Sequence, residues 1–252
     1  MTKGVAMLFL HGGKQGGWIW DEVRAAIALQ GGEAAPETVA LDVPGCGTKR
    51  GRDVAALTLA DVVEELARDI AAIQAPRLML IGHSQAGTVL PQLADAIRPR
   101  VVQLTYIACA GPAEGQTIGA MLGTGLHGEH DDCIGWPIDP ATSSPQAMTA
   151  AMFCNDMDYA QRAAFLAKLG ADDWPPACAT TETDWRYAAI RDIPASYIVA
   201  MRDQILTPHW QGRFADRLGA TRRDHVDAGH QLLQTRPQAV AEILLSIEKD
   251  CA

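Results

Sequence analysis

The segment LMLIGHSQAG, residues 78–87, predicts the fold of this chain more clearly than any other stretch. Its first four residues are apolar, as in a buried strand, and the run ends abruptly at Gly82-His83-Ser84. A serine on such a sharp turn between a strand and a helix is exposed at the edge of a sheet, and small neighbours let the backbone close there. Ala86 stands where a second glycine is usual. The motif alone fits a nucleophilic Ser84 and a serine that only caps a helix about equally, and the rest of the chain decides between them.

The size and charge of the chain narrow its class. It has 252 residues, of which 48% are hydrophobic and 20% charged, as in a globular protein with a large core. This length favours one α/β domain with an inserted segment over two independent modules. A net charge of -9 argues against a nucleic-acid partner, because phosphate binding needs clustered Lys and Arg. The one basic cluster, Lys49, Arg50 and Arg52, is interpreted as a solvated loop, with contact to an anionic substrate as the alternative.

The cysteines and the first residues indicate the environment of the protein. The six cysteines lack the short spacings of a zinc site or a disulfide framework. The chain runs from Met1 into an apolar strand without a signal-peptide pattern, and no apolar run reaches the length of a membrane span. We therefore expect a cytoplasmic protein with reduced thiols, whose partners are a small-molecule substrate and at most a second copy of itself. The acidic and histidine residues from His127 to Asp132 favour a solvated loop over a metal site, so no metal or cofactor is expected.

Strand and helix patterns alternate along most of the chain. Strands are expected at 5–10, 38–43, 78–81, 101–108, 196–200 and near 225–226, and helices at 20–29, 59–73, 89–97, 210–218 and from 237. This alternation predicts an α/β fold with a mostly parallel sheet of about six strands and helices on both faces. From 111 to 185 the rhythm breaks and Gly, Pro and Asp are frequent. We predict that this segment is a helical lid inserted after the fourth strand, with 1–110 and 186–252 forming the core.

Two more residues with catalytic chemistry follow predicted strands. Asp203 comes after the strand at 196–200, and His230 comes after the strand near 225–226. The carboxyl ends of parallel strands meet at one edge of a sheet, so we expect both side chains to lie near Ser84. A serine becomes nucleophilic when a histidine accepts its proton and an acid orients that histidine. The chain order Ser, Asp, His is the one expected when successive strands present the three residues.

Three other aspartates are alternatives for the acid. They are Asp192, Asp224 and Asp227. Asp192 precedes its strand and would lie at the opposite edge of a parallel sheet. Asp227 is so close to His230 that its side chain is expected to cap the turn instead. Asp203 is therefore the predicted acid.

An acyl-transfer reaction also needs backbone N–H groups directed at the developing oxyanion. The amide of Gln85, at the start of the helix that follows Ser84, is one predicted donor. The amide of Gly13, in the loop after the first strand, is the other. Gly12 and Gly13 lie at a strand end, where the absence of side chains lets the backbone approach a substrate.

These features together resemble the α/β-hydrolases, and the resemblance extends over nearly the whole chain. It is greatest to the branch of small esterases and hydroxynitrile lyases. The similar stretches are LFLHGGKQGGWIW (8–20), ALDVPGCGT (40–48), FCNDMD (153–158), RDQILTPHWQ (202–211) and DAGHQLLQTRPQAVAEIL (227–244). The resemblance implies a serine carboxylic-ester hydrolase with Ser84, Asp203 and His230 as catalytic triad. It also implies an oxyanion hole formed by Gly13 and Gln85, and no cofactor.

The substrate is expected to be a small, mostly apolar ester or lactone. The inserted segment contains several methionines and aromatic residues, which suit an apolar or aromatic ligand better than a sugar. The predicted pocket residues are Gly12, Trp18, His83, Trp136 and Phe153.

Other functions on the same fold remain as alternatives. A hydroxynitrile lyase of this branch typically carries threonine where Gly12 stands and lysine directly after the catalytic histidine, where this chain has Gln231. Both differences favour hydrolysis. A non-catalytic small-molecule receptor is the alternative of a different class, and the presence of all three triad residues argues against it. A haloalkane dehalogenase or an epoxide hydrolase would need an aspartate in place of Ser84.

Overall fold

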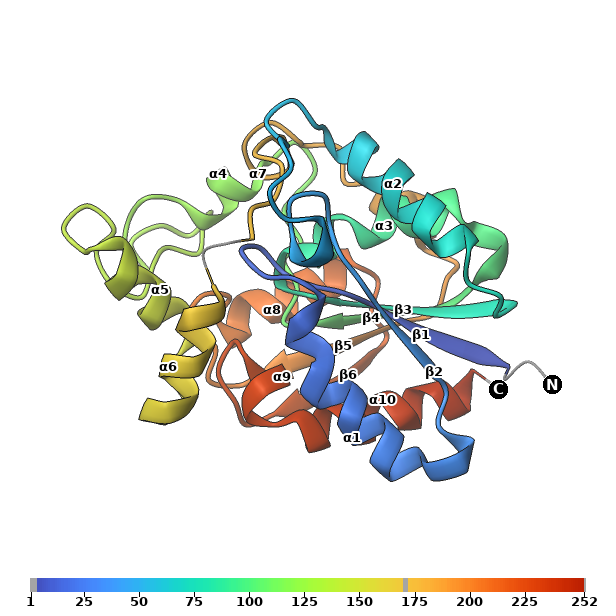
Figure 1. Ribbon diagram of the computed structural model, residues 1–252. Helices are drawn as coiled ribbons and strands as arrows, with labels where there is room; N and C mark the ends of the chain where they lie inside the picture. The colour runs from blue at the N-terminus through green and yellow to red at the C-terminus, as the bar shows by residue number, and fades with distance from the viewer. Residues whose placement is uncertain (1–3, 170–171, 252) are drawn as a thin grey trace.

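The computed structural model describes residues 4–169 and 172–251, and it contains one six-stranded sheet (Figure 1). The strands are β1 (Val5–Leu10), β2 (Glu37–Leu41), β3 (Arg77–His83), β4 (Val101–Ile107), β5 (Ala195–Ala200) and β6 (Arg222–Val226). Their order is β2-β1-β3-β4-β5-β6, and every neighbouring pair is parallel, so the predicted sheet is confirmed. Residues 1–3 and 252 of the predicted core, and 170–171 of the predicted insertion, lie outside the described residues.

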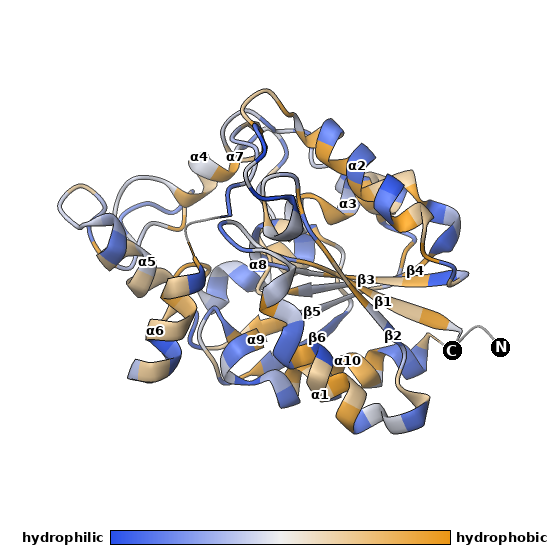
Figure 2. Ribbon diagram, viewed as in Figure 1, coloured by the Kyte–Doolittle hydropathy of each residue, from blue (hydrophilic) through white to orange (hydrophobic). Residues whose placement is uncertain are grey.

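Helices cover both faces of the sheet, which explains why its central strands are apolar throughout. Neighbouring side chains of β1, such as Leu8 and Phe9, belong to two different buried clusters. The cluster around Leu8 includes side chains from α2 (Leu59–Ala71), α3 (Leu90–Ala96) and α8 (Pro208–Arg217). The cluster around Phe9 includes side chains from α1 (Asp21–Gly31), α9 (Leu232–Thr235) and α10 (Pro237–Asp250). Figure 2 shows the apolar strands between these helical layers.

The start of α2 illustrates how local sequence sets an element. Thr58 Oγ1 accepts a hydrogen bond from Asp61 N, and Asp61 Oδ2 accepts one from Thr58 N at 2.8 Å. This capping box satisfies backbone donors that the first turn of a helix leaves free. The helix expected at 59–73 is confirmed and spans Leu59–Ala71.

The chain between β4 and β5 contains four short α-helices in its described part. They are α4 (Ile118–Leu122), α5 (Pro145–Phe153), α6 (Tyr159–Lys168) and α7 (Ala177–Thr180). In Figure 1 this insertion extends to the left of the sheet, on the side opposite the two chain termini. Because β1 begins near the N-terminus, that side corresponds to the carboxyl ends of the parallel strands.

Two further properties of the described residues bear on the environment of the protein. Within the described ranges, no helix combines the length and the apolar character needed to cross a membrane. All six cysteines are unpaired there, and five of them are buried.

Candidate active site

Ser84 lies on a strained turn directly after β3. Its φ angle is +55°, which non-glycine residues rarely adopt, and a 3-10 turn (η4, Ser84–Thr88) separates it from α3. A Cβ at Gly87 would lie 2.3 Å from the carbonyl oxygen of Ala110, so position 87 requires glycine. Ala86 is accommodated and fully buried. The departure from the usual glycine at position 86 therefore leaves the turn intact, because the closest backbone approach falls one residue later.

His230 connects Ser84 to Asp203 by two hydrogen bonds. Its Nε2 lies 2.9 Å from Ser84 Oγ, and its Nδ1 lies 2.7 Å from Asp203 Oδ2. Asp203 follows β5 and His230 follows β6, so the carboxyl edge of the sheet brings the three residues together. With Nδ1–H donating to the carboxylate, Nε2 is free to accept the serine proton.

The three alternative aspartates are engaged elsewhere. Asp192 pairs with Arg98 at 3.0 Å, Asp227 with Arg202 at 2.8 Å, and Asp224 with Arg222 at 2.9 Å. Asp192 and Asp227 are exposed, whereas Asp203 and His230 are buried. Among the four candidates, Asp203 is the one that the structure places against the imidazole.

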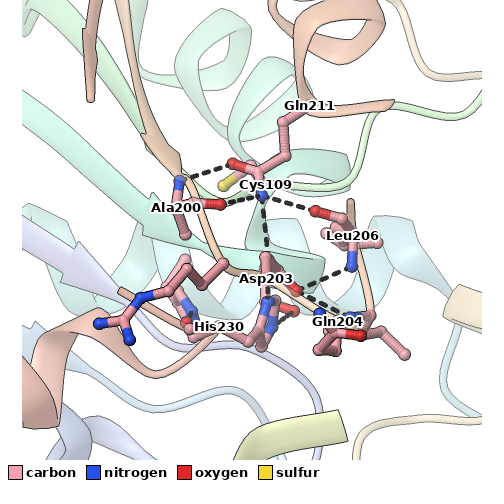
Figure 3. Close-up of polar contacts among 12 residues, drawn as sticks. Cys109, Ala200, Asp203, Gln204, Leu206, Gln211 and His230 are labelled. Atoms are coloured by element: carbon pink, nitrogen blue, oxygen red, sulfur yellow. Dashed lines mark hydrogen bonds and ion pairs between the residues drawn. The ribbon is translucent and has the colours of Figure 1, made fainter. Parts of the chain in front are cut away.

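Gln211 of α8 holds the carboxylate of Asp203, and the sequence analysis missed it (Figure 3). Its Nε2 donates to Asp203 Oδ2 at 3.0 Å, while its Oε1 accepts from Ala200 N at 3.0 Å. Asp203 Oδ1 accepts from the backbone amides of Ile205 and Leu206 at 2.8 and 3.0 Å. Gln211 is fully buried. Its position three residues before the buried Phe214, on the same face of α8, was the available signal.

Two buried histidines shape the backbone around the site. The Nε2 of His83 donates to the carbonyl oxygen of His230 at 2.9 Å, and burial holds the pKa of His83 well below its usual value. His11 donates from Nδ1 to the carbonyl of Gly12 at 2.8 Å and accepts at Nε2 from Val43 N. Burial also lowers the pKa of His11. Both imidazoles are therefore neutral near pH 7, and they fix the neighbouring backbone by hydrogen bonds.

The loop after β1 lies directly against the serine turn. A Cβ at Gly12 would lie 2.7 Å from Ser84 Cβ, and a Cβ at Gly13 would lie 2.5 Å from Gln85 Oε1. Glycine at both positions allows this approach. Gln85 is the second residue of the 3-10 turn, where a backbone N–H has no partner within the helix. Gly13 and Gln85 both line the cavity next to Ser84, as the predicted oxyanion donors must.

A cavity of about 220 Å³ opens beside Ser84 and His230. Apart from these two residues and Gly13 and Gln85, its lining is mostly apolar: Lys14, Ala110, Ile118, Met121, Leu122, Trp136, Met152, Phe153, Ala179, Ile205 and Leu206. Lys14 is the only lysine, arginine or acidic residue in this lining, among the residues that the structure describes. The cavity therefore suits an apolar ligand.

The structure separates the five predicted pocket residues into two groups. Trp136 and Phe153 line the cavity. Gly12, Trp18 and His83 are absent from its lining. Gly12 is covered by Ser84, His83 is fully buried beneath His230, and the indole of Trp18 donates to Asp172 Oδ2 at 2.9 Å. None of these three residues faces the cavity.

The cations of the basic cluster have partners within the protein. Arg50 donates to Asp172 at 2.6 Å, whereas Lys49 and Arg52 pair with Glu65 at 2.8 and 2.7 Å. Arg50 and Arg52 are exposed, as expected for a solvated loop, and each cation of the cluster has an acidic partner within the protein. Across residues 4–169 and 172–251, no group of three or more His, Cys, Asp or Glu side chains could hold a metal ion.

The fold and this arrangement define a class. The chain belongs to the alpha/beta hydrolase family, whose sequence pattern it matches over residues 7–243. It is similar to Esterase PIR7B of Oryza sativa subsp. japonica, with 25% identity over 95% of this chain and 94% of the relative. It is also similar to the Carbendazim hydrolyzing esterase of Nocardioides sp. (strain SG-4G), with 27% identity over 46% of each chain.

Solved structures show the same fold. An extracellular alpha/beta-hydrolase from a Paenibacillus species has a TM-score of 0.76 at 17% identity, covering 96% of this chain and 98% of that one. Polyneuridine aldehyde esterase has a TM-score of 0.73 at 16% identity, covering 96% and 98%. At such identities the likeness concerns the fold alone.

Proposed function

We propose that this protein is a serine carboxylic-ester hydrolase that acts through an acyl-enzyme on Ser84. The observation that carries the proposal is the continuous hydrogen-bonded chain from Ser84 through His230 to Asp203, at the edge of an apolar cavity. The curated relatives named above as esterases support the same activity. An unreactive serine would need neither the strained turn nor a buried imidazole with an oriented carboxylate.

The proposed reaction has two halves. His230 accepts the proton of Ser84 as Oγ attacks the ester carbonyl, and the amides of Gly13 and Gln85 stabilise the oxyanion. The tetrahedral intermediate collapses, the C–O bond to the alcohol breaks, and His230 gives its proton to the leaving alkoxide. A water, deprotonated by His230, then attacks the acyl-enzyme. The bond between the acyl carbon and Ser84 Oγ breaks, the acid leaves, and His230 returns the proton to Ser84 Oγ. Asp203 keeps the imidazole in the required tautomer throughout.

The proposed substrate is a small, mostly apolar ester or lactone. A 220 Å³ cavity lined by methionine, leucine, isoleucine and aromatic residues would bind such an acyl group by its apolar surface. We also propose that the predicted insertion, residues 111–185, acts as a cap over Ser84. Six of the lining residues, Ile118, Met121, Leu122, Trp136, Met152 and Phe153, come from it.

A specific observation disfavours the hydroxynitrile lyase alternative. A Cβ at position 12 would lie 2.7 Å from Ser84 Cβ, so the threonine typical of those lyases does not fit this backbone without a shift. Gln231, which stands where they carry lysine, is fully buried and is not part of the cavity lining. Neither feature of the lyases is therefore available here.

Hydrolysis of a series of p-nitrophenyl esters, from acetate to octanoate, tests the proposal. We expect activity in the wild type and a loss of about 10⁴-fold or more in kcat for Ser84→Ala and for His230→Ala. Ser246→Ala, on α10, is the matched control and should leave activity unchanged. Retained hydrolysis in both active-site variants would falsify the mechanism. A folded wild type that is inactive on these esters and on lactones would favour the alternative of a non-catalytic small-molecule receptor.

A further inference from the structure

The segment Phe153–Asp156 of the insertion contacts both loops that carry the partners of Ser84. Asn155 Nδ2 donates to the carbonyl oxygen of Arg202 at 2.7 Å. Asp156 Oδ2 accepts from the backbone N–H of Gly229 at 2.8 Å. Arg202 immediately precedes Asp203, and Gly229 immediately precedes His230. Two consecutive side chains of the insertion thus hold the two loops at equivalent places.

Asp156 also holds the chain that follows His230. Its Oδ2 accepts a second hydrogen bond, from the Thr235 hydroxyl at 2.9 Å, at the end of α9. The carboxylate therefore connects the loop before His230 with the short helix after it. Because both donors meet one oxygen, a shift of Asp156 would move both sides of the imidazole's backbone.

The fit between this segment and the His230 loop is close. A Cβ at Gly229 would lie 2.3 Å from Asn155 Oδ1 and 2.7 Å from Asp156 Oδ1, so glycine is required there by contact. The Phe153 ring lies 5.7 Å from the His230 imidazole, centroid to centroid. The segment therefore meets both the backbone and the ring of the proposed base.

We propose that Asn155 and Asp156 are positioning residues, which keep the Asp203 and His230 loops in the relative placement that lets His230 reach Ser84. The two loops follow different strands, β5 and β6, and they are joined directly by the hydrogen bond from Arg202 N to Ala228 O at 2.8 Å and by the ion pair of Arg202 with Asp227. Asn155 and Asp156 add contacts from a third element, which hold each loop at the residue directly before Asp203 or His230. Displacements of about 1 Å at such a site can cost about 10²-fold in rate, so the loss of either contact should be visible in kinetics. The kinetic part of this inference rests on the proposed ester hydrolysis.

The test compares Asp156→Ala and Asn155→Ala with the control Asp158→Ala. Asp158 caps α6 through Gln161 N at 2.8 Å, in the same segment. We expect kcat to fall about 10- to 100-fold in Asp156→Ala, less in Asn155→Ala, with KM changed less than kcat. Asp156→Asn should recover most of the rate, because its amide oxygen can still accept from Gly229 N–H. Asp158→Ala should retain the wild-type kcat, whatever its thermal stability.

A spectroscopic readout separates this inference from the proposed function. The Nδ1 proton of His230, hydrogen-bonded to Asp203, should give a downfield NMR signal in a Ser84→Ala background, where no turnover occurs. We expect the signal to shift or broaden in the added Asp156→Ala variant, but not with Asp158→Ala. If Asp156→Ala does not fold, Thr235→Val removes one of the two donors with little change in volume and should give a weaker effect of the same kind. An unchanged signal together with a kcat within twofold of wild type would overturn the inference.

Discussion

The central sheet and the α5–α6 part of the insertion between β4 and β5 are stabilised in different ways. Most core side chains of the sheet belong to two large buried clusters, one on each face. In the insertion, α5 and α6 share only a small separate cluster of Phe153, Cys154 and Phe165. Much of their attachment comes instead from single polar contacts such as Asn155 to Arg202 and Asp156 to Gly229. The comparison teaches that the sheet and its helices hold most of the buried apolar core, while the α5–α6 part adds few core contacts but lines the cavity through Met152 and Phe153.

The largest expected effect contrasts a core side chain with one in the insertion. Leu8→Ala, in the centre of β1, should lower the free energy of unfolding by about 2–5 kcal/mol, because it leaves a cavity in a packed cluster. Phe165→Ala should cost less in global unfolding, because its cluster has few members and can open locally. Urea denaturation of both variants measures the loss of global stability, and hydrogen exchange over residues 145–168 detects local opening in Phe165→Ala. Equal losses of global stability would contradict the comparison.

A second comparison sets Gln211, buried beside the sheet, against Gln161, exposed in the insertion. Gln211→Leu removes the acceptor of Ala200 N and a donor to Asp203, which should cost about 1–3 kcal/mol of stability and lower kcat as well. Gln161→Leu, on the exposed start of α6, is its matched control in the insertion and should affect neither strongly. Thermal unfolding and ester hydrolysis, measured on the same samples, check both expectations. A stable Gln211→Leu variant with normal kcat would show that Asp203 is held well enough without it.

The smallest expected effect is the pH dependence of stability. Burial lowers the pKa of His83 and of His11, so the folded state binds fewer protons than the unfolded state once pH falls below about 6.5. Their contribution is therefore complete above that pH. It is lost as the pH falls, by up to about 1.4 kcal/mol per pH unit for each histidine. Urea denaturation between pH 8 and 5 should show a shallower slope in His83→Gln, whereas His130→Gln, exposed on the insertion, should match the wild type.

The sequence predicts the strands and the meeting of the residues at their ends, but not the orientation of every side chain near the site. The strands are predictable because burial on both faces makes each of them a continuous apolar run, as in β1 and β3. The meeting of Ser84, Asp203 and His230 is predictable because parallel topology fixes which strand ends share an edge. Trp18 and His83 show the limit of this reasoning. Sequence proximity to the site says nothing about which way a side chain points, and neither of the two lines the cavity.

Contacts that depend on tertiary packing could not be predicted either. Gln211 contacts Asp203 across the turn into α8, eight residues away, and Asp156 contacts Gly229, which is 73 residues away. The pairing of Arg50 with Asp172 similarly joins two loops far apart in the chain. No local pattern encodes such contacts, although a buried polar residue on an apolar helix face, as at Gln211, marks where one exists.

The close contact of Gly229 with Asn155 and Asp156 limits how such an enzyme can be recombined or diversified. The corresponding segment taken from a relative would bring its own residues to positions 155 and 156, and these would meet a loop that fits Asn155 and Asp156. Because the two segments are in direct contact, the effects of substitutions in them are coupled, and a change in one requires a compensating change in the other. In chimeras of this family, residues 153–158 and 227–235 should therefore be exchanged together.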